Sequence, residues 1–416
     1  MLKGGIVACH TLVQCAVSFA CLLCAKAQHS PSGFGEQGSL DLSIYIYDLP
    51  ARFQNLSSLP TNIQRDYNSA GYGGEKRIPE ALKEVGYVTE DASQASFFLV
   101  PVWLYAVRYH RSLHLPAGSP LPVERQVLST TIDYISTHYP FWNASSQGRN
   151  HIWVLTNDNG FCGFARGEET FDEIKDSIIL THWGLQATEV HCSVKERLAS
   201  FNQCPERAQK AGKANHLPCF NPRKDVLIAP TAWEKFEYLP VGNGRHHRRR
   251  LQSHLGDQYP VALHQPRRLQ ADDDFIRLEA TSSKKEHTFF FVGALREQAA
   301  EYSHGVRQTI AALFNTTPGF YINRKPLSHE ELVKEIGRSH FCLAPSGAGW
   351  GSRLKLAIKV GCIPVVIQDN VQMPYENVLP YKDFALRLPQ HAVHDLQRIL
   401  EELLQKQPQR VQEMHI

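Results

Sequence analysis

Residues 341–367 constrain the fold of this chain more than any other stretch. They read FCLAPSGAGWGSRLKLAIKVGCIPVVI: an apolar run, a glycine-rich bend, a short amphipathic segment and a second apolar run. Both runs suit buried strands, and the segment between them carries Leu354, Ala357 and Ile358 on one helical face before Gly361 ends it. Strand, bend, helix and strand in this order predict a parallel α/β sheet.

The same alternation runs through the rest of the chain. We expect further strands over residues 43–47, 96–102, 151–155, 225–229, 288–292, 320–323 and 384–388. We expect helices over residues 78–85, 123–139, 299–314, 329–337 and 393–404. The pattern fails over residues 242–286, so the sequence predicts an N-terminal α/β domain at 41–240, a basic linker or disordered insertion at 241–287 and a C-terminal α/β domain at 288–416.

The first 27 residues read as a secretory leader. Lys3 precedes an uncharged apolar run over residues 6–25, and Ala25-Lys26-Ala27 supplies the small-x-small pattern that signal peptidase accepts. A run of this length also suits an uncleaved membrane anchor, so both alternatives stay open. Residues 28–40, rich in Ser, Gly, Pro and Gln, read as a stem. We therefore expect the folded part in the Golgi or another secretory-pathway lumen, as a cleaved or a type II membrane protein.

Cysteines and sequons agree with passage through that pathway. Six of the ten cysteines follow the leader, and sequons stand at Asn55, Asn143 and Asn315. We expect disulfides among the six in an oxidising lumen. The cysteines most expected to form disulfides share one loop-like region, and they are Cys192, Cys204 and Cys219.

Charge gives little information about partners. A formal net charge of +3 on 416 residues gives no reason to expect nucleic acid. We interpret the basic run at 245–250 as a solvated loop, with contact to an anionic glycan or lipid headgroups as the alternative. The acidic triplet at 272–274 resembles pairs that hold a metal ion, but it follows no strand, so we expect no metal site there.

The bend itself predicts a phosphate site. Gly347, Gly349 and Gly351 let backbone N–H groups approach a ligand at the positive end of the following helix. Ser346 and Ser352 supply hydroxyls or a helix cap.

Arg353 strengthens this interpretation. A cation in the first turn of a helix opposes the helix dipole, and a bound diphosphate would compensate for it. The alternative is a side chain that turns to solvent or pairs with a nearby carboxylate.

Two familiar phosphate motifs can be compared with these residues. No Gly-Lys-Ser or Gly-Lys-Thr follows the bend, which excludes a Walker loop. A dinucleotide fingerprint fits better, because Gly347 and Gly349 are spaced correctly and Asp369 ends the next strand, but Ser352 replaces the third glycine. Pro364 in that strand, and the position of the unit late in its domain, count against it.

A series of short motifs links the two halves of the chain. In order they are IYIYDLP at 44–50, an apolar run into Val-Pro at 95–101, YPFWN at 139–143, GRNH at 148–151, DVLIAP at 225–230, FFFVG at 289–293 followed by Arg296, GVR at 305–307, FCLAP at 341–345, SRL at 352–354, GCIPV at 361–365 and PYE at 374–376. With these motifs in this order, the sequence resembles the exostosin family of glycosyltransferases over nearly the whole folded chain.

This resemblance implies a fold and an activity. The fold is α/β, with two Rossmann-like domains facing a cleft, of the GT-B type. The activity is inverting, metal-independent transfer of a sugar from a nucleotide sugar, a UDP-sugar, to a polysaccharide or protein-linked glycan. The C-terminal domain would hold the donor, and no further cofactor would be required.

Site residues follow from the chemistry of such a transfer. Arg296 and Arg307 join Arg353 as candidates for the diphosphate, because guanidinium binds phosphate oxygens in bidentate fashion. Glu376 could accept hydrogen bonds from the ribose or the donor sugar. Surface salt bridges for the arginines, and a simple turn for the glutamate, are the alternatives.

The general base is expected from the N-terminal domain. Asp158 follows the strand at 151–155, where a loop would face the cleft, and it is our candidate base, with an Asx-turn as the alternative. His151 stands at the opposite end of that strand, and we interpret it as structural.

One position departs from the family pattern. Where many members place an acidic residue, as in Arg-Leu-x-Glu-Ala, this chain has Leu356. The departure motivates a second hypothesis, a catalytically inactive subunit that binds glycan or partners an active glycosyltransferase. An NAD-dependent oxidoreductase that uses Asp369 is the third.

Overall fold

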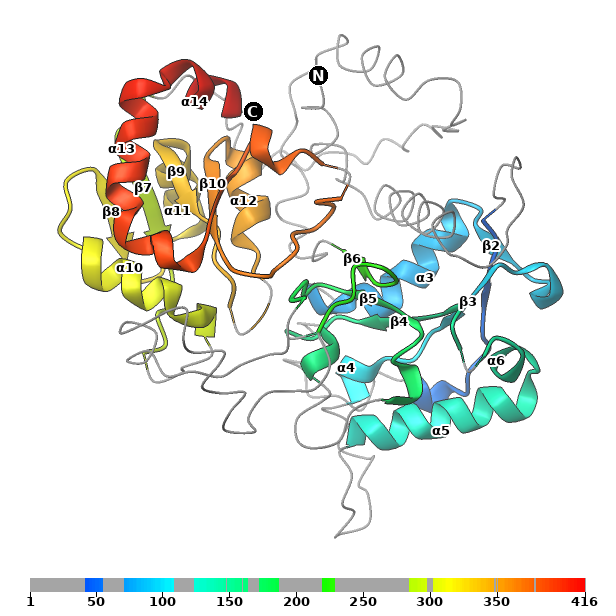
Figure 1. The fold of residues 1–416 in the computed structure, drawn as a ribbon. Coiled ribbons are helices and arrows are strands. Elements are labelled where there is room, and N and C mark those ends of the chain that lie inside the picture. The colour runs from blue at the N-terminus through cyan, green and yellow to red at the C-terminus, as the bar shows by residue number, and fades with distance from the viewer. Residues whose placement is uncertain are drawn as a thin grey trace, which may run out of the picture.

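The protein is described by a computed structural model over part of its length. The described residues are 42–54, 71–107, 123–146, 148–158, 160–163, 172–186, 219–228, 284–297, 302–347, 349, 351–377 and 379–415. Within these ranges the chain forms two lobes, drawn from blue to green and from yellow to red, each built on its own parallel sheet (Figure 1).

The first lobe contains a six-stranded sheet in which every neighbouring pair is parallel. Its strands are β1 (Ile44–Ile46), β2 (Val88–Thr89), β3 (Phe97–Val100), β4 (His151–Leu155), β5 (Ile178–Thr181) and β6 (Val226–Leu227), in the order β2-β1-β3-β4-β5-β6. Its α-helices are α3 (Gly74–Glu84), α4 (Leu104–Val107), α5 (Val123–His138) and α6 (Phe141–Ala144).

The second lobe contains a five-stranded parallel sheet. Its strands are β7 (His287–Val292), β8 (Phe320–Asn323), β9 (Ser339–Leu343), β10 (Ile363–Ile367) and β11 (Leu386–Leu388), in the order β11-β10-β9-β7-β8. Its α-helices are α10 (Val306–Phe314), α11 (His329–Gly337), α12 (Arg353–Val360), α13 (Leu396–Lys406) and α14 (Pro408–Met414).

Both sheets share one topology. In each, the first strand lies between the second and the third, which is the doubly wound order with a switch point between strands one and three. The switch points fall between β1 and β3 and between β7 and β9. The predicted fold class, two Rossmann-like α/β domains, is confirmed. The domain boundaries at 240/241 and 287/288 stay predictions, because residues 231–283 lie outside the described ranges.

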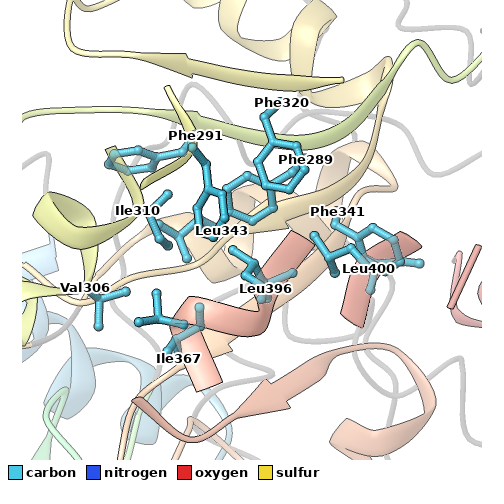
Figure 2. Close-up of a cluster of buried hydrophobic side chains, with 14 of the residues drawn as sticks. Phe289, Phe291, Val306, Ile310, Phe320, Phe341, Leu343, Ile367, Leu396 and Leu400 are labelled. Carbon is cyan, nitrogen blue, oxygen red and sulfur yellow. The ribbon is translucent and has the colours of Figure 1, made fainter. Parts of the chain in front are cut away.

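Each sheet buries both faces, as strands covered by helices on two sides must. In the second lobe alternate residues face opposite layers. Figure 2 shows one layer, where Phe289, Phe341 and Leu343 pack with Ile310 of α10 and Leu396 of α13. The other layer lies against α11 and α12, and it comprises Phe290, Val292, Val333, Ile336, Cys342, Leu356, Ala357 and Cys362.

A disulfide ties two of these strands together. Cys342 of β9 is bonded to Cys362, the residue before β10. Cys219 is also disulfide-bonded, in agreement with the expectation of disulfides. Cys192 and Cys204, expected in the same region, lie outside the described residues.

The two lobes meet through the loops that follow β5 and β10. Leu185 and Val371 form an antiparallel bridge, with Gln186 N donating to Asn370 O at 2.8 Å and Gln372 N donating to Gly184 O at 2.8 Å. A Cβ at Gly184 would lie 2.2 Å from Gln372 O, so only glycine allows this approach. The carboxyl-terminal edges of the two sheets are therefore brought together.

Several sequence expectations need correction. The helix predicted over 299–314 was wrong at its start: α10 begins at Val306, because Ser303, His304 and Gly305 all have left-handed backbone torsions that no α-helix contains. The helix predicted over 393–404 is α13, which begins at Leu396 after a 3-10 turn, and α14, beyond the predicted range, was not expected. Strands β2 and β5 were not expected. The ending of α12 at Gly361 is confirmed by a left-handed φ of 75°.

Candidate active site

The glycine-rich bend lies beside the switch point of the second sheet, between β9 and α12. Gly347 N donates to Gly349 O at 3.0 Å, which closes the bend on itself. A Cβ at Gly351 would lie 2.3 Å from Pro345 O, so this glycine is required for close packing. Ser352 stands at the N-cap of α12 but makes no capping hydrogen bond with its side chain.

Ser346 carries an unusual hydroxyl within this bend. Its side chain is 2% exposed, and its Oγ has no hydrogen-bond partner among the described residues. Buried polar groups almost always have a hydrogen-bond partner, so a buried hydroxyl without one is a candidate contact for a bound group.

Three arginines lie near Tyr302, in the loop between β7 and α10, and two of them lie over its ring. The guanidinium carbons of Arg296 and Arg307 lie 4.9 Å and 4.7 Å from the ring centroid. Arg353, the first residue of α12, donates from Nη2 to Val292 O at 3.0 Å, at the end of β7. No carboxylate forms an ion pair with any of the three in the part of the chain that the structure describes.

The electrostatics of this cluster favour an anion. Burial lowers the pKa of Arg353 and of Arg307, and the charges of Arg353 and Arg296 lower the pKa of Arg307 further. Guanidinium groups stay protonated in proteins, so the arrangement keeps uncompensated positive charge in a desolvated place. An anion with several oxygens would relieve it.

Arg307 differs from the other two because its guanidinium is occupied by protein atoms. Nε and Nη2 donate to Ser346 O at 3.0 Å and 2.6 Å, and Nη1 donates to Ala294 O at 3.2 Å and to Tyr302 Oη at 2.9 Å. The structure thus places Arg307 behind the bend, where it joins the bend to the loop after β7. Arg296, by contrast, is exposed.

A left-handed segment holds that loop in position. Arg296, Ser303, His304 and Gly305 have φ values of 48°, 52°, 52° and 78°. Ser303 N donates to Gly347 O at 2.7 Å, which fixes the segment against the bend. Strained backbone torsions of this kind persist only where contacts with the surrounding structure hold them, and they often cluster at functional sites.

Asp158 lies at the carboxyl-terminal end of β4, across the lobe junction. Its Oδ1 accepts a hydrogen bond from Tyr72 Oη at 2.6 Å, and the Tyr72 ring stacks on Tyr105 with centroids 4.2 Å apart. Nearby, Trp183 of the first lobe contacts His304 of the second, with ring centroids 5.9 Å apart. The loop after β4, which carries Asp158, and the loop after β7, which carries Arg296 and Tyr302, thus belong to facing edges of the two sheets.

Glu376 occupies a different part of the junction. Its Oε2 accepts from Met373 N at 2.8 Å, and Oε1 forms an ion pair with Arg387. It lines a cavity of about 340 Å³ together with Gln186, Asn370, Val371, Gln372, Asn377 and Arg387. The structure does not join Glu376 to the arginine cluster through any interaction of the described residues.

Two other residues considered in the sequence, His151 and Asp369, make hydrogen bonds within their own lobes. His151 is fully buried, its Nε2 lies 2.7 Å from Tyr47 Oη, and burial lowers its pKa to about 3, which confirms the structural interpretation. Asp369 accepts from Gln390 N at 3.0 Å and so holds the turn before α13.

Leu356 does not face the bend. It is buried in the layer between the sheet and α12, against residues such as Phe290 and Cys342. In this chain the position therefore contributes to packing.

The sequence did not point to Tyr302 or to the left-handed run before α10. Neither has a residue pattern of its own, since Ser303 and His304 adopt torsions usually left to glycine. The glycine at 305 was the one available signal, because a left-handed residue can precede a helix as well as end one.

Two doubly wound α/β domains that face each other across an edge-to-edge junction define a GT-B architecture. The chain belongs to the exostosin GT47 family. The model of the Exostosin GT47 domain matches residues 39–238 and 241–403, which is most of the chain. Family membership leaves the dinucleotide interpretation, with Asp369 as a ribose ligand, without support.

Related proteins with curated names are named as probable glucuronosyltransferases. A protein of Arabidopsis thaliana named as a probable glucuronoxylan glucuronosyltransferase is 29% identical over 366 residues, covering 86% of this chain and 63% of that protein. A protein of Oryza sativa subsp. japonica named as a probable glucuronosyltransferase is 26% identical over 374 residues, covering 87% of this chain and 70% of that protein. This chain thus spans less than two thirds of the Arabidopsis relative.

Two solved structures show a distant likeness to this chain. The crystal structure of TarM matches with a TM-score of 0.27 and 7% identity, covering 71% of this chain and 54% of that chain.

Some sequence expectations fall outside the described residues. These are the leader at 1–27, the stem at 28–40, the sequon at Asn55, the basic run at 245–250 and the acidic triplet at 272–274. Among the residues that are described, no helix has both the length and the apolar character needed to cross a bilayer.

Proposed function

We propose that this chain transfers a sugar from a nucleoside-diphosphate sugar to a polysaccharide acceptor. The observation that carries the proposal is the set of three arginines around Tyr302, without a carboxylate partner among the described residues, at the switch point of the second sheet. In doubly wound sheets ligands bind at this place. A diphosphate supplies the negative oxygens that the cluster lacks.

The names of the relatives suggest which donor to test first. Several are named glucuronosyltransferases, and two are named glucuronoxylan glucuronosyltransferases. We therefore propose UDP-glucuronic acid as the first donor and a xylan-type polysaccharide as the first acceptor.

Arg353 and Arg296 would bind the diphosphate oxygens directly, beside the N-terminus of α12 and the Ser346 hydroxyl. Ser352, Gly347 and Gly349 would let the backbone approach the same oxygens. Arg307 would contribute charge and hold the bend in place through Ser346 O and Ala294 O. Glu376 would serve the ribose or sugar only after it leaves its pair with Arg387.

The transfer step would proceed with inversion and without a metal ion. The bond between the anomeric carbon and the diphosphate oxygen breaks, and its electron pair leaves with the diphosphate, where the arginines stabilise the developing charge. The acceptor hydroxyl forms the new bond to the anomeric carbon from the opposite side. Its proton passes to Asp158, the candidate base. Tyr72 would orient that carboxylate through its 2.6 Å hydrogen bond.

We propose a secretory-pathway lumen, such as the Golgi, as the location. The disulfide between Cys342 and Cys362 supports an oxidising compartment. Asn143 and Asn315, the sequon asparagines in the described ranges, are both exposed and accessible to glycosylation. The leader would act as a signal peptide or as a type II anchor.

A second candidate is a subunit that binds donor or glycan without catalysing transfer, as partner of an active glycosyltransferase. Leu356 favours it, because this position offers packing in place of the carboxylate that many family members have. Turnover separates the two candidates, since both predict ligand binding and only the first predicts product.

Calorimetric titration with UDP and UDP-glucuronic acid tests the site. Arg353→Gln should weaken UDP binding more than tenfold, because a charge-assisted hydrogen bond contributes about 1.5–3 kcal/mol. Arg398→Gln is the matched control, since Arg398 is exposed on α13 and pairs with Asp395, in the turn before that helix. Equal affinities for Arg353→Gln and the wild type would exclude the site.

A further inference from the structure

Gln368, like Ser346, has a buried polar side-chain atom without a hydrogen-bond partner among the described residues. The residue follows β10 directly and is 8% exposed. Its Oε1 is buried without a hydrogen-bond partner, and its side chain makes no hydrogen bond to any described residue. Whichever end of the amide faces inward, one polar atom stays unpaired, which is rare in native proteins.

The register of the sheet places Gln368 level with Ser346. Leu343 of β9 pairs with Val365 of β10, and Ser346 and Gln368 each follow three residues later. They keep the parity of Ala344 and Val366, whose side chains pack together with Leu354 of α12. Both residues lie beyond the ends of neighbouring strands, and continuing the alternation of the strands to them places both side chains on the side of the sheet that α12 covers.

The spacing of the strands relates Gln368 to the arginine cluster. Arg353 is bonded to the end of β7, β9 is the next strand, and β10 is the one after it. Neighbouring strands are about 4.8 Å apart, so the end of β10 is roughly 10 Å from the end of β7. Ribose and the transferred sugar are attached directly to the two ends of the diphosphate, and either can extend over this distance.

We propose that Gln368 binds a hydroxyl group of the nucleotide sugar, on the ribose or on the transferred sugar, next to Ser346. A hydroxyl can donate to the amide oxygen or accept from the amide nitrogen, so it satisfies the buried end in either orientation. This inference rests on the proposed function, because the diphosphate site determines where the hydroxyl lies.

A structural role for Gln368 predicts the opposite response to an apolar replacement. Gln368→Met keeps the length of the side chain and removes both polar ends. If the amide serves a ligand, the substitution stabilises the free protein, since a buried unpaired polar group is lost, and weakens binding. If the amide serves the fold, the substitution lowers the melting temperature and leaves the affinity unchanged.

The test combines the melting temperature of Gln368→Met with calorimetric titration of UDP, 2′-deoxy-UDP, 3′-deoxy-UDP and UDP-glucuronic acid. Gln397→Met, on α13, is the matched control because Gln397 pairs with Glu401 away from the site. We expect the melting temperature to stay the same or rise and the affinity to fall by about 3- to 10-fold, the effect of one hydrogen bond.

The ligands distinguish the source of the hydroxyl. For a ribose hydroxyl, Gln368→Met weakens UDP but has no further effect on the deoxy analogue that lacks the bonded group. For a sugar hydroxyl, it weakens UDP-glucuronic acid and spares UDP. Wild-type affinity of Gln368→Met for all four ligands would overturn this inference and leave the proposed function intact. If the wild-type protein binds neither UDP nor UDP-glucuronic acid, both fall together.

Discussion

The three arginines around Tyr302 differ in what their guanidinium groups contact. Arg307 bonds to backbone carbonyls on both sides, Arg353 bonds to one carbonyl, and the Arg296 side chain makes no hydrogen bond to any described residue. The number of free N–H groups therefore increases from Arg307 to Arg296. We expect direct ligand contact to follow the same order, with Arg307 acting on the shape of the bend.

Asp158 gives the residue-scale prediction for the chemical step. Asp158→Asn keeps the size of the side chain and its ability to accept from Tyr72, but it cannot take the proton of the acceptor. We expect kcat to fall by a factor on the order of 10² to 10⁴, the usual contribution of a general base. UDP affinity should stay at the wild-type value, since Asp158 lies in the other lobe. Initial rates and calorimetry together measure both quantities, and normal turnover would exclude Asp158 as the base.

Some of the candidate site residues could be predicted from general properties of the sequence. A glycine-rich bend before a helix and an arginine in its first turn have general physical consequences, so Arg353 and Ser346 could be proposed as site residues. The roles of Arg307 and Glu376 could not be derived in the same way. Arg307 bonds to Ser346 O and Glu376 pairs with Arg387. No sequence pattern indicates either contact.

At the scale of elements, the beginning of α10 explains why the site has its shape. Helical periodicity continues through residues 299–314, so the sequence predicts a helix there. Contacts with the bend and with the loop after β7 override that preference: Ser303 N donates to Gly347 O, and Gln308 Nε2 donates to Leu295 O at 2.7 Å. Buried strands such as β4 and β10 were simpler to predict, because continuous apolar runs between turn residues allow few alternatives.

Two histidines lie close together at the amino-terminal ends of the strands in the second sheet, one in β9 and one directly after α14. The rings of His340 and His415 are 5.8 Å apart, and His340 Nδ1 and His415 Nε2 are buried without hydrogen-bond partners among the described residues. Burial lowers the pKa of His340 to about 4 and lowers that of His415, and the nearby charge of Lys285 lowers both further.

These shifts predict acid destabilisation. Each histidine has a folded-state pKa below its unfolded value of about 6.5, so below that pH the unfolded chain binds more protons and stability falls. Each histidine can lower the free energy of unfolding by up to about 1.4 kcal/mol for every pH unit below its unfolded pKa. Denaturant unfolding of wild type between about pH 7 and pH 4 should show the decline, and His340→Phe should reduce its slope. His391→Asn, at an exposed position, is the control, and equal slopes in wild type and His340→Phe would contradict the account.

At the scale of the whole molecule, the junction determines whether the base and the arginine cluster can serve one reaction. The alternation of strands and helices was enough to predict two α/β domains. Their mutual approach was not predictable, because it depends on contacts such as the backbone bridge between Leu185 and Val371 and the apolar layer around Trp183. These contacts join loops 186 residues apart in the sequence, as the pair of Gln186 and Gln372 illustrates.

Gly184→Ala tests the junction. The new Cβ would lie 2.2 Å from Gln372 O, a backbone atom, so the two loops must separate. We expect a loss of about 1–3 kcal/mol in stability and a lower kcat, while UDP binding by the second lobe persists. Gly337→Ala, whose new Cβ would meet nothing closer than 3.7 Å, should resemble wild type. Normal stability and turnover in Gly184→Ala would show that the junction is not needed in this form.

A crystal structure of the protein with UDP tests the central claim most directly. The account predicts the diphosphate between Arg296 and Arg353, with an oxygen close to the Ser346 hydroxyl and the N-terminus of α12. A nucleotide bound at any other place, with these arginines still lacking an anion, would contradict it.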